Sequence, residues 1–168
     1  MSRNDGWVVL LLLVSFPRLP DAKELHPGPC LARETSIVVD VEKRRLWLCK
    51  ANEVSGEFPV ALGRKGAGKR LAGDDKTPVG DYSLGEPRPS KQFGTFIPIG
   101  YPTEQQRKRG ATGKDVGLHG PLRDFAWVGR ATTSINWTRG CIAVGSDDDI
   151  DEIARWIESE RPSSIHIG

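Results

Sequence analysis

The pattern of hydrophobic and polar positions predicts β-strands in the first half of the chain. Residues 36–41 are rich in β-branched side chains, and the polar residues 42–44 separate them from the apolar stretch 45–49. Two such stretches joined by a short polar turn are typical of a β-hairpin. Residues 57–62 have a similar pattern and predict a third strand, which a glycine-rich loop over residues 63–75 follows.

Further stretches carry weaker strand signals. Residues 78–84 predict a turn leading into a strand, and residues 93–99 and 116–119 are short apolar stretches, the second of which ends in a histidine. Ser164–Ile167 predicts a last strand, and residues 103–109 predict a short surface helix. Together these segments favour a mainly β fold with short helical segments.

Ser146–Glu160 carries the clearest helical pattern in the chain. Ile150, Ile153, Ala154 and Ile157 recur at the spacing of one helix face, which predicts a helix that packs on the core through this stripe. Ser146 is a suitable N-cap, and the three aspartates after it lie where the helix dipole favours negative charge. Their position at a helix start explains these aspartates better than a metal site does.

Composition supports a single β-rich domain and argues against nucleic acid as a partner. The chain has 168 residues, of which 19 are glycine and 12 are proline, and this suits a turn-rich β protein. Its 24 basic and 22 acidic residues leave a net charge of +2, which is too balanced for a nucleic-acid-binding protein. We expect one folded domain that acts as a monomer.

The first 22 residues predict a secretory leader. Arg3 precedes an apolar run over residues 7–16, and a polar, proline-containing exit follows, as in a signal peptide. The run is shorter than the about 20 apolar residues that span a bilayer. We predict cleavage after Ala22, a linker over residues 23–35 and a folded domain over residues 36–168. An uncleaved anchor is the alternative and would be the protein's only contact with a membrane; either reading predicts export to the periplasm or cell envelope.

The chain contains three cysteines, an odd number for an exported protein. Cys30 lies shortly before the first predicted strand, and Cys49 ends the second. The two can approach each other across the hairpin and form a disulfide, although two buried free thiols are an equal alternative. Cys141 is then the unpaired cysteine.

Cys141 and His119 are the candidate chemical residues. His119 lies between glycines in residues 117–121, and Cys141 follows 22 positions later, after Gly140. A cysteine nucleophile needs a nearby base, backbone amides that can face a developing oxyanion, and solvent access. His119 can supply the base, and the turn over residues 138–141 can supply the amides. A buried core cysteine is the alternative, whereas the absence of Cys-x-x-Cys and His-x-x-x-His spacing argues against a metal site.

The sequence resembles the YkuD-type L,D-transpeptidase catalytic domain. His119-Gly120, followed by Thr138-Arg139-Gly140-Cys141-Ile142, is similar to the family signature of His-Gly and then Ser/Thr-x-Gly-Cys with a hydrophobic residue. Residues 76–82 are similar to the family's Lys/Arg-Thr-Pro-x-Gly-x-Tyr/Phe segment, and the hairpin and the strand over residues 58–63 also match. The resemblance covers roughly residues 36–157.

The resemblance implies a YkuD-like β-sandwich and a cysteine acyl transfer without a metal or an organic cofactor. Cys141 would attack the carbonyl at the L-centre of diaminopimelate in a peptidoglycan stem peptide, and His119 would protonate the leaving D-Ala. Amides near Arg139, Gly140 and Cys141 would hold the oxyanion, Thr138 would support the loop, and a backbone carbonyl would orient the imidazole. An amine of a neighbouring stem or of a protein would then accept the acyl group, in 3→3 cross-linking or protein attachment.

The chain departs from the family pattern at two positions. Arg139 stands where many members have histidine, and Ala143 stands where many carry an arginine that helps to bind substrate. Arg139, Arg123 or Arg130 can replace that arginine in binding a substrate carboxylate.

Three further residues are candidates for substrate binding. Tyr101, Gly120 and Trp137 can line the groove, with core packing as the alternative for the two aromatic residues.

Other functions remain open from the sequence alone. With water as the acceptor, the same residues would make an L,D-carboxypeptidase or a peptidoglycan amidase. A non-catalytic cell-wall-binding module is an alternative from another class, and the presence of both His119 and Cys141 argues against it. A thiol-redox protein is disfavoured because the cysteines are scattered along the chain.

Overall fold

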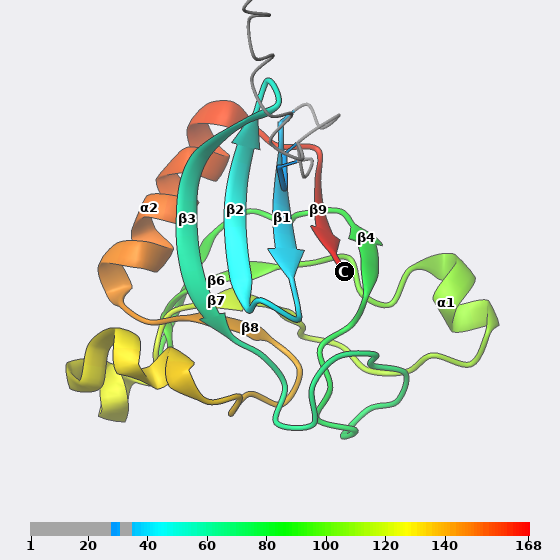
Figure 1. Cartoon of the computed structure of the whole chain (residues 1–168). Helices are drawn as coiled ribbons and strands as arrows, with labels where there is room; N and C mark the ends of the chain where they lie inside the picture. The colour runs from blue at the N-terminus through cyan, green and yellow to red at the C-terminus, as the bar shows by residue number, and fades with distance from the viewer. Residues whose placement is uncertain (1–27, 31–34) are drawn as a thin grey trace, which may run out of the picture.

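The computed structural model describes residues 28–30 and 35–168, and within these residues nine strands form one sheet. The leader predicted over residues 1–22 and most of the predicted linker lie outside the described residues. The strand order is β4-β9-β1-β2-β3-β8-β7-β6-β5, and the sheet curls so that β6, β7 and β8 run crosswise to β1 and β2 (Figure 1). This architecture confirms the predicted mainly β, sandwich-like fold.

The first half of the sheet is built on the predicted hairpin. β1 (Ser36–Asp40) pairs antiparallel with β2 (Arg45–Lys50), and β2 pairs with β3 (Glu53–Ala61). β9 (Ser164–Ile167) adds parallel to β1, and the short β4 (Gly80–Tyr82) closes this side antiparallel to β9.

The second half of the sheet contains or adjoins the candidate residues His119 and Cys141. The end of β3 pairs with β8 (Ile142–Val144), which lies parallel to β7 (Gly117–His119). Then follow β6 (Gly94–Pro98) and β5 (Arg88–Ser90). β3 thus belongs to both halves, and the core fills the space between them.

The helix predicted near the C-terminus is present as α2 (Asp147–Glu160). The Ser146 side chain accepts a hydrogen bond from the Asp149 N–H, which is the predicted N-cap. The predicted apolar stripe faces the core, where these helix residues are buried: Ile150, Ile153, Ala154 and Ile157. α2 packs against β6 and β8 and so supports the strands that carry the site.

Other elements differ from the sequence-based expectation. The predicted surface helix is α1 (Glu104–Lys108), with the Thr103 and Gln106 capping box. The sequence did not reveal β5, β8 or the 3₁₀ segment η1 (Arg123–Ser134), which is kinked at Gly129. β5 and β8 have three residues each, too few for a period-two pattern, and η1 has no helical stripe that faces the core.

A disulfide joins Cys30 to Cys49, one of the two alternatives that the sequence left open. The pair packs with Val38 and Trp47 in a small cluster separate from the main core. Cys141 is the one free cysteine among the described residues. No helix within the described part of the chain is long and apolar enough to cross a membrane.

Candidate active site

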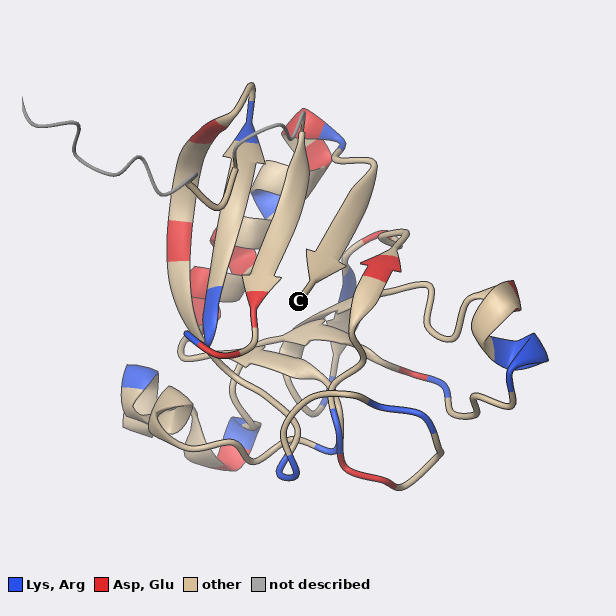
Figure 2. Ribbon diagram, turned by 45° about the vertical axis from the view of Figure 1, so that its right-hand side comes forward, with Lys and Arg blue, Asp and Glu red and all other residues tan. Residues whose placement is uncertain are grey.

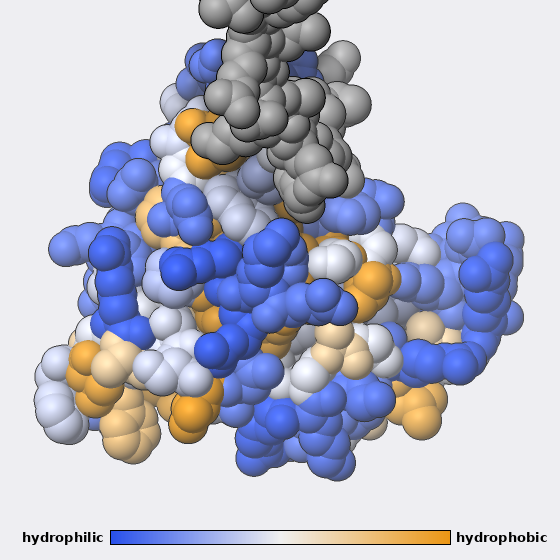
Figure 3. Space-filling model, viewed as in Figure 1, coloured by the Kyte–Doolittle hydropathy of each residue, from blue (hydrophilic) through white to orange (hydrophobic). Residues whose placement is uncertain are grey.

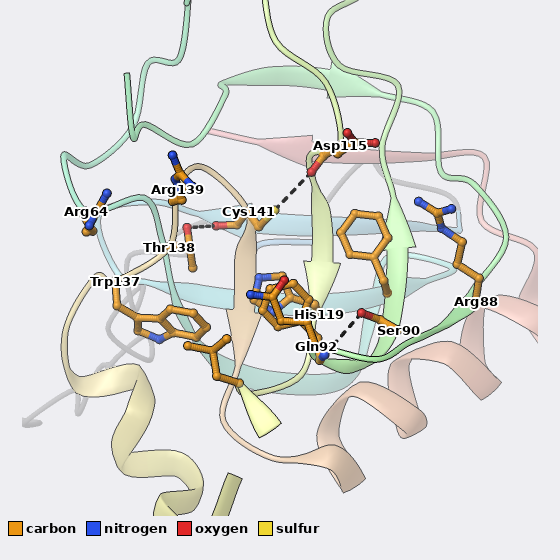
Figure 4. A pocket seen from close by; sticks show the side chains of 13 residues that line it. Arg64, Arg88, Ser90, Gln92, Asp115, His119, Trp137, Thr138, Arg139 and Cys141 are labelled. Carbon is orange, nitrogen blue, oxygen red and sulfur yellow. Dashed lines mark hydrogen bonds between the residues drawn. The ribbon is translucent and has the colours of Figure 1, made fainter. Parts of the chain in front are cut away.

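Sheet pairing brings His119 and Cys141 into one cavity. β7 and β8 are parallel neighbours in which Leu118 lies opposite Ile142 and His119 opposite Ala143. His119 therefore ends β7, and Cys141 directly precedes β8 on the adjacent strand. Both side chains line a cavity of about 510 Å³ (Figure 4). Residues separated by 22 positions in the chain thus become neighbours through a parallel pairing.

The His119 imidazole is buried and held in one orientation. Its Nδ1 lies 2.6 Å from the carbonyl oxygen of Gly120, and because a carbonyl can only accept, Nδ1 carries the proton and leaves Nε2 as an acceptor. Phe93 stacks on the ring at 3.8 Å between centroids, and Trp137 contacts it edge-on at 5.6 Å. Burial lowers the pKa of His119 from 6.5 to about 4, against the opposing effect of the Gly120 contact. The imidazole is therefore neutral at pH 7 and can act as a base.

The Cys141 thiol is also neutral at pH 7, because its pKa is raised. Burial raises its pKa, the Asp115 charge adds to this effect, and the Gly117 backbone and the Lys69 charge oppose it. The thiol donates to the carbonyl oxygen of Asp115 at 3.6 Å, and no hydrogen bond joins it to His119 among the described contacts. The site thus holds a thiol and an imidazole rather than an ion pair, so a nucleophilic role for Cys141 would require proton transfer during attack.

Thr138 organises the turn that carries the nucleophile. Its hydroxyl donates to the Cys141 carbonyl oxygen at 2.7 Å and accepts from the Gly140 N–H at 3.1 Å. Gly140 has a φ of 130°, and a Cβ there would lie 2.7 Å from the Lys76 carbonyl oxygen, so glycine is required. The Gly140 N–H therefore has a partner inside the turn, and its expected role toward an oxyanion stays a prediction. The amides near Arg139 and Cys141 stay candidates for that role.

The segment over residues 76–82 lies behind the nucleophile. The buried Thr77 hydroxyl lies 3.5 Å from the Cys141 carbonyl oxygen. Lys69, from the preceding glycine-rich loop, has a side chain only 5% exposed and donates to Asp74 at 2.8 Å. This buried ammonium group contributes the positive charge that opposes the rise in the thiol pKa.

The charged side chains of the cavity wall are mainly basic. Arg64, Arg88 and Arg139 line it with a single acidic residue, Asp115. Arg64 is paired with Asp75 at 2.9 Å, outside the cavity lining. Figure 2 shows basic residues along the loop between β3 and β4, which supplies Arg64 to one wall.

Two of the three arginines proposed to bind a substrate carboxylate lie elsewhere. Arg123 forms an ion pair with Asp147, and Arg130 forms one with Asp149 at 2.7 Å. Both arginines neutralise the acidic first turn of α2 and do not line the cavity. Arg139 alone of the three lies at the site.

The other candidate substrate-binding residues divide in the same way. Trp137 lines the cavity, and Gly120 lies beside it and supplies the carbonyl that holds the imidazole. Tyr101 is 6% exposed, lies in the core, and donates to the Thr112 carbonyl oxygen at 3.3 Å. The structure thus places Tyr101 in the core, the alternative that the sequence left open.

Several residues of the site have no recognisable signal in the sequence. These residues come from four different segments, and each is ordinary in its local context: Phe93, Arg88 and Asp115 in the cavity wall, and Lys69 through its charge. The one signal in the sequence is that Asp115 lies four positions before His119 and so stands close to the His-Gly motif.

An apolar groove adjoins the cavity along η1. Figure 3 shows apolar side chains over this segment, where Phe125, Trp127 and Ile135 are exposed. The groove has a volume of about 410 Å³ and shares Leu122 and Trp137 with the cavity that holds His119 and Cys141. Substrate groups that leave the cavity on this side therefore meet an apolar surface.

Within residues 28–30 and 35–168, no three His, Cys, Asp or Glu side chains are close enough to hold a metal ion together.

Comparison with known proteins identifies the family. The family model of the YkuD L,D-transpeptidase catalytic domain matches residues 34–165, and the chain belongs to this family. No curated protein matches the chain.

Several solved structures share the fold. The helical cell shape determining protein Pgp2 from Campylobacter jejuni has a TM-score of 0.62 at 20% identity over 80% of this chain and 47% of that chain. Bd1075 from Bdellovibrio bacteriovorus has a TM-score of 0.55 at 24% identity over 80% and 48% of the two chains. An L,D-transpeptidase from Mycobacterium smegmatis has a TM-score of 0.53 at 15% identity over 80% and 58%. The chain spans less than two thirds of each of these proteins.

Proposed function

We propose that the protein is an exported L,D-transpeptidase that forms a cysteinyl acyl-enzyme on peptidoglycan stem peptides and passes the acyl group to an amine. The observation that carries this proposal is the cavity that holds both Cys141 and a neutral His119, with the imidazole oriented by a backbone carbonyl. Membership of the family supports the reaction class. The predicted leader followed by a catalytic domain over residues 36–168 supports action in the periplasm or envelope.

Acylation begins with the thiol. The Cys141 side chain turns from the Asp115 carbonyl towards His119, and its proton moves to Nε2 as sulfur bonds to the carbonyl carbon at the L-centre of diaminopimelate. Amides of the turn at Arg139 and Cys141 hold the oxyanion. The C–N bond then breaks, and the D-Ala nitrogen leaves with the proton from His119.

Deacylation reverses the proton path. An acceptor amine attacks the thioester carbonyl while His119 takes its proton, and the C–S bond breaks to return the thiolate. The imidazolium then returns the proton to sulfur, which restores the neutral pair. Water in place of the amine would give carboxypeptidase activity through the same steps.

A carbapenem tests the nucleophile by forming a stable acyl adduct. The purified protein should gain one adduct in its intact mass, Cys141→Ala none, and His119→Ala one that forms much more slowly. His166→Ala is the matched control, because His166 lies on β9, contacts Asp81 of β4 and does not line the cavity, so this variant should react like the parent. A folded, reduced parent that stays unmodified would refute the catalytic proposal and favour the binding module.

Stem peptides then identify the acceptor. A tetrapeptide stem incubated with an amine acceptor should give a cross-linked product that lacks one D-Ala. Product that consists only of free tripeptide would show that water is the acceptor and that the protein is a carboxypeptidase.

A further inference from the structure

Two arginines of the cavity have no acidic partner among the described residues. Arg88 begins β5, and Arg139 lies in the turn that carries the nucleophile. Figure 4 shows them on opposite sides of Cys141 and His119. The nucleophile thus lies between two cations from separate parts of the chain.

The other two charged residues of the cavity wall, Arg64 and Asp115, each lie near an oppositely charged residue outside the wall. Arg64 is paired with Asp75 at 2.9 Å. Asp115 has an exposed carboxylate 3.9 Å from Lys114, so it does not neutralise either free arginine. An anionic ligand would therefore meet Arg88 and Arg139 without displacing a protein carboxylate.

Arg88 is held in place before a ligand arrives. Its guanidinium lies 5.2 Å from the centroid of the Phe96 ring, and Phe96 is the residue opposite Arg88 in the β5–β6 pairing. Phe96 itself is buried, so the ring is a fixed platform. A guanidinium can bind a carboxylate through two parallel hydrogen bonds, and this contact with Phe96 leaves its N–H groups free to do so.

The substrate of the proposed function has a carboxylate on each side of the bond that breaks. The leaving D-Ala carries one directly beside its nitrogen. The D-centre of diaminopimelate carries the other, on the acyl side and several bonds away from the attacked carbonyl. The near carboxylate suits Arg139, two residues from the nucleophile, and the far one suits Arg88 on another strand.

We propose that Arg139 binds the leaving D-Ala carboxylate and that Arg88 binds the D-centre carboxylate of diaminopimelate, so that the site selects stems carrying both. This inference rests on the proposed function. Arg88 would take the place of the arginine that many family members carry two positions after the nucleophile, where this chain has the buried Ala143.

The test compares kcat/KM for three tetrapeptide stems: the free acid, the C-terminal amide and the D-centre amide. The parent, Arg88→Gln, Arg139→Gln and Arg123→Gln are measured, with Arg123→Gln as the control because that arginine pairs with Asp147 outside the cavity. Alkylation of Cys141 by iodoacetamide, which is neutral, reports that the nucleophile is intact in each variant.

Arg88→Gln should lower kcat/KM for the free acid by about 10-fold to 100-fold, mainly through KM, as expected for the loss of a charged hydrogen-bonded pair. It should cause little further loss on the D-centre amide, which already lacks its partner. Arg139→Gln should show the same insensitivity on the C-terminal amide, and Arg123→Gln should match the parent on all three.

Equal losses on all three stems, no loss, or the opposite pairing would overturn the assignment of these carboxylates. A parent that does not turn over any stem would instead refute the proposed function itself. Normal turnover by the parent together with an unaffected Arg88→Gln would refute the present inference alone.

Discussion

The neutral state of His119 can be tested by lowering the pH. Burial brings its pKa from 6.5 to about 4, a difference worth about 3 kcal/mol for protonation in the folded protein. Because the folded pKa lies below the unfolded one, His119 contributes stability that is fully present above about pH 6.5. That stability is lost as the pH falls towards about 4, and no more is lost below that value.

Urea unfolding of the parent and of His119→Gln across this range isolates the effect. Carboxylates titrate in both proteins, so only the difference between them reports on the imidazole. The parent should lose stability relative to the variant by about 1.4 kcal/mol for each pH unit between about 6.5 and 4. NMR titration of the imidazole gives the pKa directly.

Activity should follow the same group. The rate of carbapenem acylation should persist well below pH 6 and fall only as His119 takes up a proton, near pH 4. Unfolding curves that stay parallel, together with an imidazole pKa near 6.5, would show that water solvates the ring. Burial between Phe93 and Trp137 would then not set the protonation state of His119.

Three further changes have defined outcomes. Cys30→Ser opens a disulfide that joins Cys49 across 19 positions, and urea unfolding should show a loss of about 3 kcal/mol; an unchanged midpoint in oxidising buffer would argue that the bond does not form. Gly140→Ala places a Cβ 2.7 Å from the Lys76 carbonyl oxygen at positive φ, and should cost about 1–3 kcal/mol and slow acylation, so a stable variant with parental rates would contradict the turn geometry. Asp115→Asn removes a charge that raises the pKa of the Cys141 thiol, so the pH profile of Cys141 alkylation should move to lower pH; a shift to higher pH would contradict this effect of Asp115.

Local sequence patterns predicted the elements that are long enough to show a period. The β1–β2 hairpin and α2 were predicted because β-branched alternation and the 3.6-residue stripe are properties of short windows. β5, β8 and η1 were not, since three-residue strands and an irregular 3₁₀ segment carry no such repeat. Their conformations depend on the neighbouring strands and on α2.

Some residues of the site could be predicted from local sequence, and others could not. His119 and Cys141 stand in motifs that the chain displays directly, so the sequence alone determined the candidate pair and its family resemblance. From the sequence alone, Arg123 and Arg139 were equal candidates for binding a substrate carboxylate. Only the structure separated them, because the position of α2 pairs Arg123 with Asp147 while the turn after η1 places Arg139 in the cavity.

The tertiary structure also decided the protonation state and the charge of the site. The low pKa of His119 comes from its burial against Phe93, which lies in the turn between β5 and β6. No local sequence pattern predicts that contact. Arg88 reaches the cavity because the curled sheet carries β5 around to face the nucleophile turn. The sequence by itself determined which atoms can react, whereas the long-range strand pairing determined their solvation and the cations that surround them, because both depend on residues distant along the chain.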